Sequence, residues 1–207
     1  MTAVAQPASA GLAPIIRRVD DTPADEALLS AYARGDARAF ARLYERHERP
    51  VYRFLLRALN GNAATADDLL QETWLAVVRN AVAWEPRARF TTWLYTIARS
   101  KLLDHWRARV PVVSLDDEAV NDPDQTALAA DETAQPEVRV LSRAQARTFV
   151  AAVELLPAAQ REAFLLHAEG GLSVDELAQA TGVGFETAKS RLRYAMTRLR
   201  SAMADWR

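Results

Sequence analysis

Residues 173–200 read SVDELAQATGVGFETAKSRLRYAMTRLR, which indicates two short helices joined by a glycine turn. Ser173 and Glu176 have the spacing of a capping box, in which the two side chains cap the start of a helix reciprocally. Gly182 supplies the left-handed residue that such a turn needs. Five basic residues and one acidic residue lie between positions 185 and 200. The pattern therefore predicts a helix-turn-helix whose second helix enters the major groove of DNA.

The first half of that second helix carries the side chains expected to contact DNA. They are Thr187, Lys189, Ser190, Arg191, Arg193 and Tyr194. The alternative is an ordinary basic helix on the surface of a helical bundle. The order of capping box, glycine turn and basic helix favours the DNA-binding interpretation.

A second segment, residues 90–107 (FTTWLYTIARSKLLDHWR), combines aromatic and basic residues on a predicted helix. Aromatic rings can stack on bases, and cations can hold phosphates. The preceding loop, AWEPRARF at 83–90, has the same composition and is a candidate pocket for an unstacked base. By itself it would be an ordinary surface loop. Of Trp93, Tyr95 and Trp106, we expect at least one in the core.

A third segment, residues 66–78 (ADDLLQETWLAVV), is amphipathic. Leu70, Trp74 and Val77 form the stripe that we expect to be buried, because they recur at helical spacing. Asp68, Gln71, Glu72 and Arg79 then face outward. Acids near a helix start also stabilise the helix dipole, so simple capping is one explanation. The other is a docking face for a basic partner helix.

Composition limits the function classes. The 207-residue chain contains no cysteine, so disulfides, thiolate metal sites and thiol nucleophiles are excluded. No signal peptide or membrane span is expected, and a cytoplasmic location fits. The net charge is −1, but residues 1–110 carry +4, residues 111–137 carry −8 and residues 138–207 carry +3. Weakly basic blocks release few counterions on binding DNA, so a partner is expected to supply much of the affinity.

The predicted fold class is all-α, with two small helical domains joined by an acidic flexible linker. The expected boundaries are a flexible tail at 1–21, a first domain at 22–110, a linker at 111–136 and a helix-turn-helix domain at 137–207. Within the first domain, Pro50 is expected to kink or break a helix. Thr65 is expected to cap the third helix, and Thr91 or Thr92 to open the fourth.

With these residues in view, the chain resembles the sigma-70 family of bacterial initiation factors, and most closely their extracytoplasmic-function (ECF) group. The resemblance covers about 24–109 and 152–200. It rests on motifs at residues 67–74, 90–99, 156–164 and 182–191.

The resemblance implies an alternative sigma factor that binds core RNA polymerase and helps to open promoter DNA. The Asp68, Gln71 and Glu72 face would bind the polymerase clamp coiled coil. The second helix of the helix-turn-helix would recognise the minus-thirty-five element of duplex DNA, with Arg191 on a phosphate. The melted non-template strand at the minus-ten element would contact Trp84, Arg87, Arg89, Phe90, Arg99, Ser100, Lys101 and Arg107. The acidic linker would pass near the polymerase active centre. An anti-sigma factor would mask both domains.

Three alternatives stay open at this point. An autonomous helix-turn-helix regulator would explain residues 173–200 but not the aromatic and basic segment. A sigma mimic that only sequesters an anti-sigma factor would not need Trp84 or the basic helix. An enzyme is disfavoured, because His47, His105 and His167 lie far apart and no catalytic, metal or cofactor motif is present.

Overall fold

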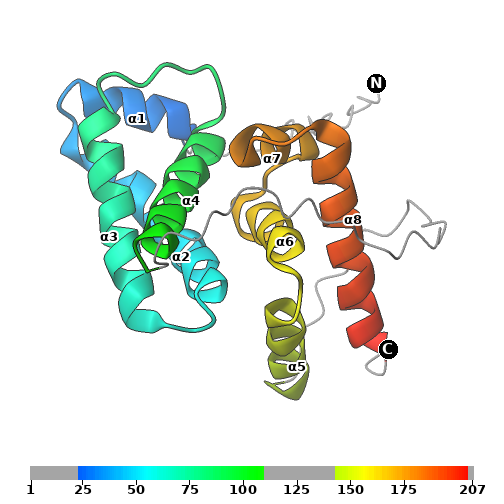
Figure 1. The fold of residues 1–207 in the computed structure, drawn as a ribbon. Coiled ribbons are helices and arrows are strands. Elements are labelled where there is room, and N and C mark those ends of the chain that lie inside the picture. The colour runs from blue at the N-terminus through cyan, green and yellow to red at the C-terminus, as the bar shows by residue number, and fades with distance from the viewer. Residues whose placement is uncertain (1–22, 110–142, 205–207) are drawn as a thin grey trace, which may run out of the picture.

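The computed structural model describes residues 23–109 and 143–204, and every regular element in these two ranges is an α-helix. The helices are α1 (Asp25–Ala33), α2 (Ala37–Ala58), α3 (Ala63–Asn80), α4 (Phe90–Arg109), α5 (Arg143–Glu154), α6 (Ala158–Gly170), α7 (Val174–Thr181) and α8 (Phe185–Ala202). Figure 1 shows α1–α4 as one group and α5–α8 as a second. The all-α prediction is confirmed for these residues. The expected tail at 1–21, the acidic linker at 111–136 and both linker boundaries lie outside the described residues.

The helix ends in the first group follow capping rules, but two capping residues differ from those predicted. Asn62, not Thr65, caps α3, because its side chain accepts a hydrogen bond from the Thr65 N–H at 3.2 Å. Helix α4 begins at Phe90, ahead of both threonines. Its first N–H donates to Glu26 of α1 at 2.8 Å, so a carboxylate from another helix does the capping.

Pro50 does not end the second helix as predicted, because α2 runs unbroken from Ala37 to Ala58. An interior proline costs a helix about 3 kcal/mol. Burial on both sides of the proline opposes this cost: Leu43 and Val51 are fully buried, and Phe54 is nearly so. Each such side chain contributes about 1.5–3 kcal/mol when buried. Tertiary packing therefore holds α2 together across Pro50.

Helices α1 and α2 are joined by a cluster of three charged or titratable side chains. Asp25 forms an ion pair with Arg46, and its other oxygen lies 2.7 Å from Nε2 of the buried His47. Burial alone would raise the pKa of Asp25. His47 and then Arg46 outweigh that effect and hold the pKa below its ordinary value.

The two groups of helices pack against each other. Helix α2 lies against α6, and the N-terminal half of α4 lies near α7 (Figure 1). One continuous hydrophobic cluster includes Phe54 and Tyr95 from the first group and Leu166 and Leu172 from the second. Helices α3 and α8 form the opposite outer sides of the molecule (Figure 1).

Replacement of Asp25 by Asn is expected to lower the free energy of unfolding by about 1–3 kcal/mol at neutral pH, because hydrogen bonds to charged partners are weakened. The depressed folded-state pKa stabilises the fold above the unfolded-state pKa, about 3.9. This stabilisation is lost as the pH falls through the folded-state pKa. Urea unfolding from neutral pH to about pH 3 should show the difference between Asp25→Asn and wild type shrinking.

The exposed Asp67 of α3 provides the matched control, since Asp67→Asn removes a carboxylate outside this cluster. A penalty for Asp25→Asn that stayed constant down to about pH 3 would contradict the electrostatic explanation.

Candidate nucleic-acid interface

The helix-turn-helix forms as the sequence predicts. The Ser173 hydroxyl accepts a hydrogen bond from the Glu176 N–H at 3.3 Å, and the Glu176 carboxylate accepts one from the Ser173 N–H at 2.8 Å. Gly182 ends α7 with a φ of 72°, in the left-handed region. Burial would raise the pKa of Glu176, but hydrogen bonds from Ser173 and Thr92 hold it below its ordinary value. The capping carboxylate therefore stays charged around neutral pH.

Helix α8 buries Ala188, Ala195 and Leu199, and turns its N-terminal half toward solvent. Of the six residues predicted to contact DNA, three are exposed and three are half-buried: Thr187, Lys189 and Arg193, then Ser190, Arg191 and Tyr194. The Lys189 amine lies 5.9 Å from the centre of the Phe185 ring. The Arg193 guanidinium lies 5.1 Å from that of Tyr194. Cation–π contacts of this kind hold long basic side chains against the helix.

The loop between α3 and α4 is backed by a row of aromatic rings. Trp84 is half-buried, and its ring centre lies 6.1 Å from that of Trp93. The Trp93 ring is in turn 6.1 Å from Phe90, which lies 5.3 Å from His47. Trp84 is thus held by packing on one side while part of its surface stays accessible.

Phe90 itself is fully buried, with 0% exposure, so the predicted contact between its side chain and DNA is wrong for this conformation. As the first residue of α4 it packs into the core of the first group. Its ring supports Trp93 and, through Trp93, the loop. The expectation that one of three aromatics lies in the core is confirmed by Tyr95, which is 1% exposed.

Three predicted strand-binding cations extend into solvent. Arg87, Arg89 and Arg107 are exposed, and Ser100 is exposed beside them on the sequence. Arg87 donates to Glu85 at 2.8 Å, and Arg107 to Asp104 at 3.2 Å. Such exposed pairs are worth about 0–1 kcal/mol, so a phosphate can replace the carboxylate readily.

The other two predicted cations have partners on other helices. The Arg99 Nε donates to Glu162 of α6 at 2.8 Å, with both side chains about one-fifth exposed. The Lys101 amine lies 3.4 Å from the carboxylate of Glu72 on α3. The interface predicted for the strand therefore reaches both the second group of helices and the outer face of α3.

The outer face of α3 has the predicted amphipathic arrangement. Leu70, Trp74 and Val77 are buried, and the polar residues expected to face outward are exposed: Asp68, Gln71, Glu72 and Arg79. Further along the helix, Leu75 and Val78 are exposed apolar residues. The polar face therefore continues into an apolar one.

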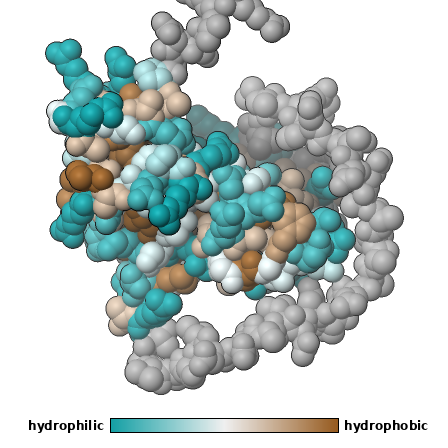
Figure 2. All heavy atoms as spheres, turned by 90° about the horizontal axis from the view of Figure 1, so that it is seen from above, coloured by the Kyte–Doolittle hydropathy of each residue, from teal (hydrophilic) through white to brown (hydrophobic). Residues whose placement is uncertain are grey.

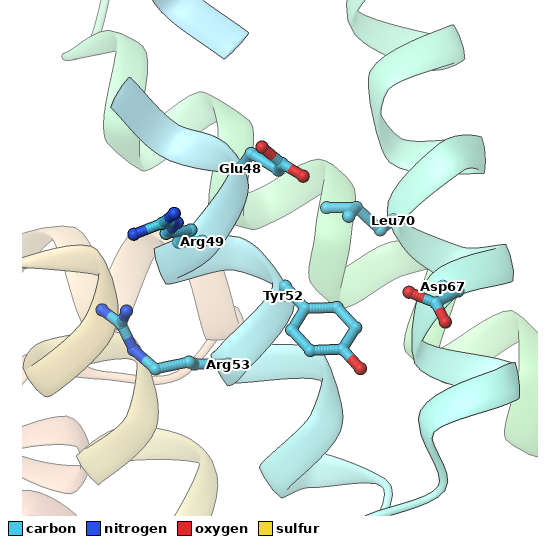
Figure 3. Close-up of a pocket in the computed structure, with 6 residues that line it drawn as sticks. All are labelled: Glu48, Arg49, Tyr52, Arg53, Asp67 and Leu70. Carbon is cyan, nitrogen blue, oxygen red and sulfur yellow. The ribbon is translucent and has the colours of Figure 1, made fainter. Parts of the chain in front are cut away.

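An open groove of about 300 Å³ lies between α2 and α3. Its lining residues are Glu48, Arg49, Tyr52, Arg53, Asp67 and Leu70. Figure 3 shows the Tyr52 ring projecting from α2 toward α3, where Asp67 and Leu70 lie. Carboxylates and guanidiniums line the groove together, which does not select a ligand of one charge.

Surface chemistry elsewhere indicates contact with macromolecules instead of a small ligand. In the view of Figure 2, apolar residues form small separate patches among hydrophilic side chains. The described residues contain no group of three or more His, Asp or Glu placed to hold a metal ion. Within the same residues, no helix is both long and apolar enough to span a bilayer.

Comparison with known proteins gives the same two units. The family model for Sigma-70 region 2 matches residues 43–110, and the model for Sigma-70, region 4 matches residues 146–199. The chain is 33% identical over 178 residues to the ECF RNA polymerase sigma factor SigM of Mycobacterium tuberculosis, covering 84% of this chain and 82% of that protein. The chain belongs to the sigma-70 family. It is an ECF RNA polymerase sigma factor that directs transcription initiation, and it is not an enzyme.

Two solved structures share the fold of this sigma factor. One is CnrH in complex with the cytosolic domain of CnrY, with a TM-score of 0.60 and 24% identity, covering 88% of this chain and 98% of that chain. The other is the sigma factor RpoE with the anti-sigma factor NepR from Bartonella quintana, with a TM-score of 0.56 and 22% identity, covering 80% and 96%. In this sigma factor, region 2 therefore corresponds to α1–α4 and region 4 to α5–α8.

Sequence reasoning missed the residues by which regions 2 and 4 of this sigma factor contact each other. They are Arg53, Arg57, Thr92, Tyr95, Glu162, Glu169 and Glu176. Partners in these contacts are separated by 63 to 116 positions in the chain. Local periodicity carries no signal at such distances, so a single sequence offered no means of pairing them.

Proposed function

We propose that this sigma factor binds core RNA polymerase through the outer face of α3, formed by Asp68, Gln71 and Glu72. The observation that carries the proposal is the orientation of these three side chains. All are exposed on one side of α3, while Leu70 and Trp74 anchor the opposite side in the core. A rigid helix with a polar outer face fits a partner helix that carries basic residues.

The minus-ten element is proposed to bind the loop before α4 and the outer surface of α4. Trp84 stacks on an unpaired base of the non-template strand, and stacking is worth about 1–3 kcal/mol per base. The cations Arg87, Arg89, Arg99, Lys101 and Arg107, with Ser100, lie along the strand. Phe90 contributes only support, because it is buried.

The minus-thirty-five element is proposed to bind the N-terminal half of α8. Thr187, Lys189, Ser190, Arg193 and Tyr194 face base edges, and Arg191 holds a phosphate. The exposed side of α8 is the outermost surface of region 4 (Figure 1), so duplex DNA reaches it without displacing another helix.

An anti-sigma factor is the proposed regulatory partner, and the proposed location of the complex is the cytoplasm. The fold neighbour RpoE was solved with such a factor. Exposed apolar side chains on region 4 give it a surface to cover, namely Val150, Leu155 and Phe185. The part expected from residues 158–168 is wrong, because Phe164, Leu165 and Leu166 are buried in the core. Residues 137–142 lie outside the described residues.

Charge reversal at Glu72 tests the polymerase assignment. Glu72→Lys is expected to weaken binding to sigma-free core RNA polymerase about ten- to a hundredfold, because it places a cation against a basic partner surface. Fluorescence anisotropy of labelled protein measures the affinity. Glu45→Lys, at an exposed position of α2, is the matched control and should bind like wild type. Equal affinity for both variants and wild type would refute the assignment of α3.

Truncation at Trp84 tests the flipped-base pocket. Trp84→Ala is expected to slow formation of the open promoter complex about tenfold or more, because one stacking platform is lost. Affinity for the closed duplex should change much less. Permanganate footprinting against gel-shift titration separates the two steps. Trp84→Phe keeps a stacking face and should recover most of the rate. A similar loss in both steps for Trp84→Ala would contradict base stacking.

Truncation at Lys189 tests recognition of the minus-thirty-five element. Holoenzyme carrying Lys189→Ala is expected to bind a two-element promoter roughly tenfold more weakly, since one good base contact is worth about 1–3 kcal/mol. The deficit should disappear on a promoter whose minus-thirty-five element is scrambled. Arg200→Ala, exposed at the other end of α8, removes a cation far from the proposed contact. If Arg200→Ala lost as much affinity as Lys189→Ala, general electrostatics would explain both.

A further inference from the structure

The contact between regions 2 and 4 is built from charged groups of opposite sign on facing helices. Glu169 of α6 is the central group, with its side chain only 6% exposed. The Arg53 Nε donates to one of its oxygens at 2.8 Å, and the Arg57 guanidinium to the other at 2.6 Å. Both arginines come from α2. A buried carboxylate needs such partners, because an unpaired one carries a large desolvation penalty.

Tyr95 of α4 adds a directional bond and close packing at the same place. Its hydroxyl donates to the backbone carbonyl of Glu169 at 2.7 Å. The next residue, Gly170, lies directly against the ring: a Cβ atom there would be 3.1 Å from Tyr95 Cδ2 and 2.7 Å from Leu172. The two helices approach this closely because residue 170 has no side chain.

A second set of contacts involves the α4 surface that we assign to the melted strand. Glu162 accepts a hydrogen bond from Arg99. Glu176 accepts one from Thr92 at 2.7 Å, and its other oxygen lies 3.6 Å from Arg89. Carboxylate and phosphate oxygens compete for the same guanidinium donors. Region 4 thus places carboxylates where the proposed function requires phosphates.

The size of the closed molecule conflicts with simultaneous binding at both elements. The structure describes 149 residues in its two ranges. A compact body of that length has a radius of gyration of about 15 Å and is roughly 40 Å across. The names of the two elements place them roughly 25 base pairs apart, or about 85 Å at about 3.4 Å per base pair.

The chain is long enough to resolve this conflict by separating the regions. Thirty-three residues lie between Arg109 and Arg143. A segment of that length reaches at most about 110 Å. Regions 2 and 4 can therefore reach both elements only after the contact between α2, α4, α6 and α7 has opened.

We propose that the contact of Arg53, Arg57, Tyr95 and Arg99 with Glu162 and Glu169 is an autoinhibitory lock that covers the strand-binding surface of α4 until core polymerase separates the regions. This inference rests on the proposed function for the role of α4. The free chain is closed, and polymerase binds the open form. The apparent affinity for polymerase is lowered by the fraction of molecules that are open.

Charge reversal at Glu169 tests the lock. Glu169→Arg places a third guanidinium against Arg53 and Arg57 and is expected to separate the regions. None of the three residues belongs to the proposed polymerase or DNA surfaces. The triple variant Glu169→Arg, Arg53→Glu, Arg57→Glu restores opposite charges and should close again. Glu154→Arg makes the same charge change at an exposed position of α5 and serves as the control.

Two measurements are compared across these variants. Because the chain has no cysteine, Asn80→Cys and Ser201→Cys introduce a unique pair of spin labels on α3 and α8. Wild type, the control and the triple variant should give a short, narrow distance distribution, and Glu169→Arg a longer and broader one. Circular dichroism confirms that each variant is folded. In parallel, Glu169→Arg should bind sigma-free core polymerase about tenfold more tightly than wild type, and the triple variant like wild type.

Several results would overturn the lock. A long distance in wild type would show that the contact does not form in the free chain. A short distance in Glu169→Arg would show that these charges do not hold it. A separated Glu169→Arg with unchanged polymerase affinity would remove the inhibitory role. The distance measurement needs no polymerase, so a chain that closes but never binds polymerase would contradict the proposed function and leave the contact itself established.

Discussion

The buried Tyr95 side chain is the point on which both halves of the molecule depend. Its ring packs edge-on against Phe54 of α2, with centres 5.4 Å apart. Its hydroxyl bonds the end of α6, and its flank receives Gly170. Burial and the neighbouring Glu169 carboxylate both raise the pKa of Tyr95, so the phenol keeps its proton and remains a donor. One side chain therefore joins the core of region 2 to that of region 4.

Local signals predicted the helices well where the capping partner lies within three residues. The capping box of Ser173 and the turn at Gly182 depend on neighbouring side chains and one backbone angle, and both were predicted correctly. The start of α4 was placed a residue or two late, because its cap is Glu26, 64 positions away. Pro50 misled for a related reason: its local cost is visible in the sequence, but the packing that opposes it is not.

The candidate site divides in the same way. Exposure of the α8 and α3 residues followed from helical periodicity, which says which side of a helix faces solvent. Phe90 was misassigned because composition does not tell whether an aromatic at a helix start supports a loop or lines its surface. The partners of Arg99 and Lys101 lie on other helices, so their present pairing could be found only from the fold.

The carboxylates of region 4 differ in how many tasks each performs. Glu176 closes the capping box of α7 as well as bonding Thr92, so two separate pressures retain it. The Glu169 side chain makes only the pairs with Arg53 and Arg57 among its hydrogen bonds within the described residues. In evolutionary terms, Glu176 would persist in a descendant whose regions no longer touched. Glu169 and its two arginines would instead drift together, so the joint history of these three positions records whether a lineage has kept its closed form.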